Sequence, residues 1–135
     1  MALSADRNTP RRAGDGLKLA LAAATLIYAG SIACRNAAGN AVPGATATTL
    51  KALGVAEERV DNSAGAAGDK SVQIRKGVFR FTNSAAADEV TIADLGNDCY
   101  IVDDQTVAKT NGTNTRSVAG KVFDVDADGV WVAFA

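Results

Sequence analysis

Two short runs in which apolar and polar side chains alternate constrain the fold of this chain most. In the segment SVQIRKGVFRFTN, residues 71–83, Val72 and Ile74 alternate with polar residues, and the alternation resumes after a glycine with Phe79 and Phe81. Successive side chains of a strand point to opposite faces, so each run is typical of a strand with one buried face. The segment therefore predicts a strand pair.

Similar short apolar runs recur along the whole chain, with turn residues between them. We expect further strands within residues 17–22, 25–30, 31–36, 50–55, 90–92, 99–104, 106–110, 118–125 and 130–135. SAAADEV, residues 84–90, favours one helical turn, and Asn111–Gly112 predicts a two-residue hairpin turn. No long amphipathic helix and no internal repeat at a fixed period is apparent. These features predict an all-β fold, a small β-barrel or sandwich of short antiparallel strands.

The first sixteen residues differ in composition from the rest of the chain. They contain three arginines and a proline but almost no large apolar side chains, so they cannot bury enough surface to fold alone. We therefore divide the chain into an extended N-terminal arm, residues 1–16, and a single β-rich domain, residues 17–135. The arm is either a flexible terminus or a segment that becomes ordered against a neighbouring subunit.

The stretch LKLALAAATLIYAGSIAC, from Leu17 to Cys34, allows two interpretations. It follows several basic residues and ends in a cysteine, as the signal of an exported bacterial lipoprotein does. Against this, Asp6 and Asp15 interrupt the basic region, and the apolar run is diluted by Thr, Gly and Ser. Leucines at every second position from Leu17 are spaced as in a strand, and we favour folded chain over a signal peptide.

Composition excludes several classes of chemistry. The chain has no histidine, so no Ser/His or Cys/His catalytic pair can form. The 14 basic and 15 acidic residues nearly cancel, which gives no overall attraction to nucleic acid or to a membrane. Cys34 and Cys99 lie in apolar surroundings, and we expect two reduced, buried thiols on strands. We do not predict an enzyme, and we predict no cofactor.

Two acidic groups remain as candidate sites. The segment DVDADG, residues 124–129, matches the first half of a calcium loop, but position twelve falls on the final alanine and no helices flank it. An Asp–Gly pair also suits a hairpin turn, which we favour. Asp94, Asp98, Asp103 and Asp104 could suggest paired catalytic carboxylates. Because they fall in predicted turns, we expect solvated corners and predict no metal site and no catalytic site.

The basic residues of the domain are densest on the segment that carries the predicted strand pair. Arg75, Lys76 and Arg80 lie within six residues of one another. Such a group is usually a solvated edge and sometimes a contact with an acidic partner. Both interpretations stay open at this point.

The order of several short motifs resembles one family. These motifs are TLIYAGSIACRNAAGNAVPG, then LGVAEERVDNSAGAAGDKSVQIRKGVFRF, then CYIVDDQTVAKT and finally AGKVFDVDADGVWV. From about Ala22 to the C-terminus the chain is similar to the capsid decoration, or cement, proteins of tailed bacteriophages, particularly those of Mu-like phages and related siphophages. Each motif alone is weak, and their succession carries the resemblance.

The resemblance implies a structural virion protein without catalytic residues. Such a protein is assembled in the host cytoplasm, binds the exterior of the capsid and stabilises contacts between major capsid subunits. Another phage structural subunit, of a tail tube or of the head–tail joint, stays open as an alternative. Because closed symmetry is the default for self-assembly, we expect a homo-oligomer, and on an icosahedral shell a trimer is favoured. The resemblance implies no direct contact with nucleic acid or a membrane. The predicted partner-binding residues are Arg7, Arg11, Arg12, Arg75, Lys76 and Arg80.

Overall fold

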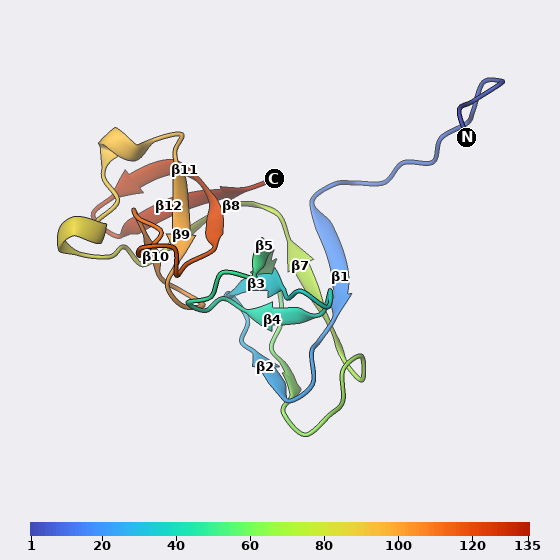
Figure 1. Cartoon of the computed structure of the whole chain (residues 1–135), viewed down its shortest axis with the longest axis horizontal. Coiled ribbons are helices and arrows are strands. Elements are labelled where there is room, and N and C mark those ends of the chain that lie inside the picture. Colours follow the sequence, from blue (N-terminus) through green and yellow to red (C-terminus); the bar gives the residue numbers. More distant parts are fainter.

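The computed structural model of the chain describes residues 1–135 and confirms the all-β prediction (Figure 1). Two five-stranded sheets and one two-stranded sheet make up the body, and all paired strands within them are antiparallel. The helical content is limited to two single 3-10 turns, η1 (Ala86–Asp88) and η2 (Ile92–Asp94). The first of these confirms the helical turn expected within residues 84–90.

The first five-stranded sheet belongs to the N-terminal half of the chain, which we call the N-terminal unit. Its strands, in spatial order, are β1 (Gly16–Ala20), β7 (Ser71–Arg75), β5 (Lys51–Ala56), β3 (Ile32–Arg35) and β4 (Ala41–Pro43). A parallel bridge between Leu21, directly after β1, and Ala41 brings the two edges of this sheet together. The small sheet of β2 (Thr25–Ile27) and β6 (Val60–Asn62) extends the same unit.

The second five-stranded sheet forms the C-terminal unit. Its strands, in spatial order, are β8 (Gly77–Phe81), β12 (Gly129–Phe134), β11 (Val118–Asp126), β9 (Asp98–Ile101) and β10 (Val107–Ala108). A parallel bridge between Thr82, directly after β8, and Thr106, directly before β10, joins its two edges. Both large sheets are therefore curled so that their edge strands meet, which leaves few open edges for unwanted pairing.

The two units have the same strand order. When the five strands of each unit are numbered along the chain, both sheets run 1-5-4-2-3, and strands 1 and 3 meet at the parallel bridge. The register also agrees. Ala33 pairs with Gly54 and Cys34 with Ala52, across one extra residue, just as Cys99 pairs with Gly120 and Tyr100 with Val118. The body therefore consists of two units that have the same fold.

Hydrogen bonds outside the strands repeat as well. Gly30 donates its backbone N–H to Ala56 at 2.8 Å, and Gly96 donates to Val122 at 2.9 Å, so that the turn before the second strand has one geometry in both units. Both of these glycines have positive φ, of 84° and 85°. The extra hydrogen bonds indicate that the correspondence extends to the loops that lead into the strands.

The sequence shows no internal repeat at a fixed period, and the repeat is visible only in the structure. Equivalent inward positions hold different side chains: Leu19 in the N-terminal unit corresponds to Phe81, and Ile74 corresponds to Val132. Packing requires apolar character and a fitting total volume at these positions rather than particular residues. The spacing between strands differs as well, so no fixed period survives in the sequence.

The two units share one hydrophobic body, because β3 and β5 are buried on both faces. Ala33 and Ala56 belong to the seven-residue core of the N-terminal unit. Ile32, Cys34 and Val55 point the other way, into the thirteen-residue core of the C-terminal unit. Strands buried on both faces read as continuous apolar runs, which fits SIAC and GVA in the sequence. The units are therefore packed together through the back of this strand pair.

Residues 71–83 form two strands, as predicted, but these strands are not a pair. β7 pairs with β1 and β5, whereas β8 pairs with β12 in the other sheet. Gly77, with φ of 145°, lies at the change of sheet, and the Lys76 N–H is bonded at 2.8 Å to the carbonyl of Asp15. The alternation predicted which residues face inward; it carried no information about the partner strand.

Two other local predictions were wrong. Residues 90–92 were expected as a strand, but Thr91 and Asp94 form a capping box that begins η2 instead. Asn111–Gly112 was expected as a two-residue hairpin turn. It starts a longer loop in which Gly112, Thr113 and Asn114 all have positive φ, and the Asn111 carbonyl accepts the N–H groups of residues 115 and 116.

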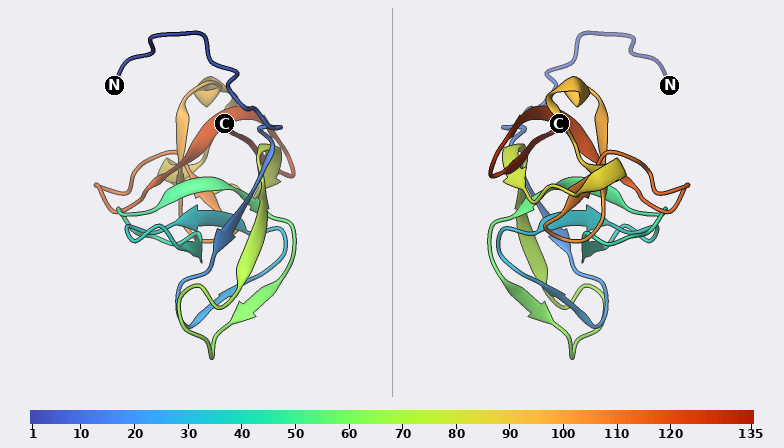
Figure 2. Two further views of the ribbon diagram at one scale, coloured as in Figure 1. Left: turned by 90° about the vertical axis from the view of Figure 1, so that its right-hand side faces the viewer. Right: turned by 90° about the vertical axis from the view of Figure 1, so that its left-hand side faces the viewer.

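The predicted strands from Leu17 to Cys34 are confirmed as β1, β2 and β3. Before them, the arm contains no strand or helix, and every residue from Met1 to Asp15 is exposed. Figures 1 and 2 show the arm extending clear of both units. The ordered strand begins at Gly16, one residue before the predicted boundary.

Candidate partner-binding surfaces

The three arginines of the arm have no acidic partner within the chain. Arg7 donates only to the hydroxyl of Thr9 at 3.3 Å, and Arg11 and Arg12 form no hydrogen bond or ion pair. The arm is anchored at its base, where Asp15 accepts from the backbone of Lys76 and lies 3.3 Å from the Arg75 guanidinium. The arm therefore presents its basic side chains to solvent.

The predicted basic group on residues 75–80 is engaged inside the chain. The Arg75 Nε donates to Glu57 at 2.6 Å, and this hydrogen bond, together with the charge of Glu57, raises the pKa of Arg75. Lys76 donates to the carbonyl of the terminal residue Ala135 at 2.8 Å. These two basic side chains link the arm, the N-terminal unit and the C-terminus.

Arg80 lies on the C-terminal unit and has a separate set of partners. Its guanidinium stacks 5.7 Å from the centre of the Trp131 ring and lies 3.9 Å from the Asp128 carboxylate. Trp131 is directly opposite Arg80 in the pairing of β12 with β8. Both groups are substantially exposed, so this interaction contributes little to stability. Arg75, Lys76 and Arg80 are thus distributed over two units and are not a single basic patch.

The DVDADG segment is the hairpin turn between β11 and β12, as favoured from the sequence. Asp126 accepts from the Trp131 indole N–H at 2.8 Å, and from the backbone N–H groups of Asp128 and Gly129 at 2.8 and 3.1 Å. These hydrogen bonds, that from Trp131 first, lower the pKa of Asp126. Both carboxylate oxygens therefore hold the turn itself.

The four aspartates proposed as solvated corners do not gather in one site, although Asp103 and Asp104 are neighbours in the turn between β9 and β10. Asp94 does not match that prediction, because it is buried and accepts from the backbone N–H of Thr91 at 2.8 Å. Asp98 forms a 2.7 Å ion pair with Lys121, and Asp103 caps the N–H of residue 105 at 2.9 Å. No three His, Cys, Asp or Glu side chains are grouped so that they could hold a metal ion.

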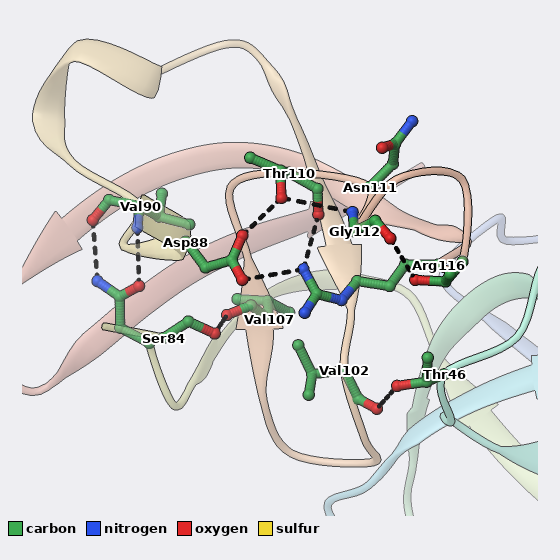
Figure 3. Close-up of polar contacts among 12 residues, drawn as sticks. Thr46, Ser84, Asp88, Val90, Val102, Val107, Thr110, Asn111, Gly112 and Arg116 are labelled. Carbon is green, nitrogen blue, oxygen red and sulfur yellow. Dashed lines mark hydrogen bonds and ion pairs between the residues drawn. The ribbon is translucent and has the colours of Figure 1, made fainter. Parts of the chain in front are cut away.

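A polar network fixes the long loop between β10 and β11 (Figure 3). Asp88 accepts from the Thr110 hydroxyl at 2.5 Å and lies 3.3 Å from the guanidinium of Arg116, which also donates to the Thr110 carbonyl at 3.1 Å. The Thr110 hydrogen bond and the Arg116 contact lower the pKa of Asp88. Arg116 is only 17% exposed, so the loop is built around a largely buried cation. The sequence analysis did not single out these residues.

The cysteine prediction is confirmed. Cys34 on β3 and Cys99 on β9 are free and fully buried, and both belong to the core of the C-terminal unit. Burial raises the pKa of each thiol to about 12, so neither is a thiolate at neutral pH. The two cysteines act as small apolar core residues.

One exposed apolar surface was missed by the sequence analysis. Phe123 is 63% exposed, and two other large apolar residues near it, Ile92 and Leu95, are 60% and 45% exposed. We call these three residues the Phe123 patch. The run KVFDV lacks strict alternation at Phe123, because this residue is the extra residue of a β-bulge between Val122 and Asp124. That break in the pattern was the available signal.

No family model matches this chain, and no curated protein or solved structure matches it either. None of the helical segments has the length and apolar character that a membrane crossing requires.

Proposed function

We propose that this protein binds the outer surface of a tailed-phage capsid and stabilises contacts between major capsid subunits. The proposal starts from the resemblance of the motif order to capsid decoration proteins. The motifs TLIYAGSIAC and AGKVFDVDADGVWV lie in β2–β3 and β11–β12, where they supply strands and tight turns. They carry no convergent chemistry, which suits a structural role.

The observation that supports the proposal best is the contrast between the body and the arm. The body consists of two curled sheets with one continuous packing scheme, and its basic residues 75, 76 and 80 are already engaged. The arm is exposed along its length, and its three arginines have no acidic partner. A rigid body with an unpaired basic arm suits a protein that fastens to a repeated surface.

Many identical contacts on a shell make modest single contacts effective. A protein attached at several points of a lattice gains from effective concentration, so weak contacts suffice for stable decoration. We propose a homotrimer as the decorating unit, located on the capsid exterior after assembly in the host cytoplasm. Neither nucleic acid nor a membrane is proposed as a partner.

Co-sedimentation with undecorated phage heads tests this function. The full chain is expected to pellet with the heads and to saturate at a fixed number of copies per head. Reversal of the arm charges in the R7E/R11E/R12E variant is expected to weaken binding at least tenfold, because these arginines are free to meet a partner. Absence of the full chain from the pellet at all concentrations would contradict the proposal.

A matched control reverses charges on the body. Arg35 and Lys51 are opposite each other on β3 and β5, are exposed and form no ion pair. The R35E/K51E variant is expected to bind heads as the wild type does. Loss of binding in this variant alone would locate the capsid contact on the body and would contradict the role of the arm.

A further inference from the structure

The three residues of the Phe123 patch lie on segments that are joined to one another by backbone hydrogen bonds. The backbone N–H of Gly96 is 2.9 Å from the carbonyl of Val122, and the N–H of Val122 is 2.9 Å from the carbonyl of Asn97. Because of these two hydrogen bonds, residues 95–97 lie alongside residues 122–123, and the backbone of Leu95 is next to that of Phe123. Ile92 belongs to the same 3-10 turn, since its carbonyl accepts the Leu95 N–H. Exposed apolar groups that gather in this way mark contact sites.

The duplication of the fold provides an internal comparison for this patch. Phe123 has no counterpart in the N-terminal unit, because the ladder there passes directly from Ala56 to Glu57, which corresponds to Asp124; the position that corresponds to Leu95 is Ala29. The N-terminal unit therefore forms the same ladder without the extra residue and with a small residue at the place of Leu95. The fold does not require large apolar side chains at these positions, so they serve another purpose.

The bulge at Phe123 supports this conclusion. At the corresponding place in the N-terminal unit, Glu57 donates its N–H to Gln73 at 2.9 Å and continues the regular ladder. In the C-terminal unit the register shifts between Val122 and Asp124, and the bulge leaves Phe123 without a partner. Bulges redirect side chains, and here the redirected side chain is an exposed phenylalanine.

Two unpaired acidic residues lie close to the patch residues in the sequence, Asp124 directly after Phe123 and Glu89 three residues before Ile92. Glu89 and Asp124 are exposed and form no ion pair, whereas the nearby Lys109 and Lys121 are paired with Asp94 and Asp98. The patch therefore suits a segment with an apolar end and free positive charge.

The arm has this composition. Met1 and Leu3 near its tip are exposed, Leu3 to 73%, and the three unpaired arginines follow at residues 7, 11 and 12. Fourteen residues span about 45 Å when extended, which is enough to cross to a neighbouring molecule. In Figure 1 the arm and η2 lie at opposite ends of the long axis, and the arm points away from the body. A second copy placed end to end would receive it.

We propose that the arm of one copy docks on the Phe123 patch of the next copy, so that copies associate head to tail. Met1 and Leu3 cover the apolar surface, and the arginines lie over Glu89 and Asp124. This proposal goes beyond capsid binding because it adds a second partner for the arm: in the free protein the arm occupies the Phe123 patch of a neighbouring copy, and on the head the capsid surface competes for the same arginines. Its test uses the purified protein without heads, so its failure is distinguishable from a failure to bind capsids.

The test is the molar mass in solution over a range of concentrations, measured by light scattering. The full chain is expected to associate, and both F123D and a chain lacking residues 2–12 are expected to have the single-chain mass at concentrations where the wild type associates. Neither change reaches the core, and circular dichroism checks the fold of each. The matched control is V118D, which changes an exposed valine near the other end of β11 and is expected to associate as the wild type does.

Mixing the two defective chains distinguishes head-to-tail contact from contact between like surfaces. F123D retains an intact arm and the truncated chain retains an intact patch, so an equimolar mixture is expected to form complexes of two chains. A mixture that keeps the single-chain mass would overturn the proposal. So would a wild-type protein that stays a single chain up to about 1 mM, where contacts of about 4 kcal/mol become visible, or an F123D variant that associates normally.

Discussion

At the scale of single residues, close approach of backbones explains why glycine occurs at two equivalent positions. A Cβ atom at Gly54 would overlap the carbonyl oxygen of Arg75, and one at Gly120 would overlap that of Ala133. Each glycine lies next to the bulge that its unit shares with the other. In both units, glycine therefore occurs where two strand backbones approach too closely to admit a Cβ atom.

We predict that G54A and G120A each lower the free energy of unfolding by about 1–3 kcal/mol, since the strands must move apart to admit the methyl group. Chemical denaturation measures this change. G14A is the control, because a Cβ at Gly14 meets nothing within 4 Å. If both core variants were as stable as this control, the described strand spacing would be incorrect.

The Asp88–Arg116 contact makes a pH-dependent contribution to stability. The pKa of Asp88 is lowered from 3.8 in the folded chain, chiefly by the Thr110 hydrogen bond. A lowered folded pKa means that the contribution is present above the ordinary value and is lost as the pH falls through the folded value. The carboxylate therefore holds the β10–β11 loop at neutral pH but not in strong acid.

The D88N variant tests this contribution through its melting temperature. We expect D88N to melt below the wild type at pH 7, and the difference to be smaller at pH 2, because the wild-type carboxyl becomes protonated only as the pH falls below its ordinary pKa of 3.8. D6N, in the arm, removes a carboxylate that makes no contact and is expected to melt as the wild type does. A difference between D88N and wild type that is equally large at both pH values would contradict the assignment.

At the scale of elements, β3 and β5 connect the two units. Ile32 contributes to the core of the C-terminal unit although it belongs to a strand of the N-terminal unit. Its pairing partner Val55 faces the same way. The corresponding pair in the C-terminal unit is Asp98 and Lys121, a charged pair at a solvent-facing surface. The back of the strand pair is apolar only where another unit covers it.

We predict that I32A lowers the free energy of unfolding by about 2–5 kcal/mol, as expected for a large-to-small change at a fully buried site. The loss is expected to affect both units together, which fluorescence of Trp131 in the C-terminal unit and far-ultraviolet circular dichroism of the whole chain can check. Trp131 fluorescence that stays at the wild-type midpoint would show that Ile32 does not support the C-terminal unit.

The strand pattern shows which features of the fold could be predicted from the sequence alone. Alternation at Val72, Ile74 and Phe81 predicted the inward residues correctly, because burial of one face is a local property of a strand. Which strands pair is not local, and β7 and β8 were assigned to each other when each pairs in a different sheet. The capping box at Thr91 was present in the sequence, and it competed with a β-branched run that resembles a strand.

The candidate surfaces were predictable only in part. The exposed arginines of the arm followed from composition, since a segment with almost no large apolar side chains cannot bury enough surface to fold alone. The Phe123 patch could not be predicted, because it depends on a bulge and on the contact of residues 95–97 with β11. Its significance emerges only when the two units are compared.

At the scale of the whole molecule, the shared core predicts a single unfolding transition. The thirteen-residue core contains side chains from both units, so neither can unfold while the other keeps its packing. We expect thermal unfolding to be two-state, and we expect a fragment of residues 77–135 to be unfolded alone, because it lacks Ile32, Cys34 and Val55. Two separate calorimetric transitions would contradict this account.

The proposed role predicts a change in the stability of the capsid shell as well as binding by the protein. A decorating protein that binds only the closed shell stabilises it by the free energy of binding. The shell can open only when these bonds between the protein and the capsid subunits are broken. The most direct measurement is the temperature at which filled heads release their DNA, with and without saturating amounts of the protein. The account predicts a higher release temperature for decorated heads. An unchanged release temperature at saturation would contradict it.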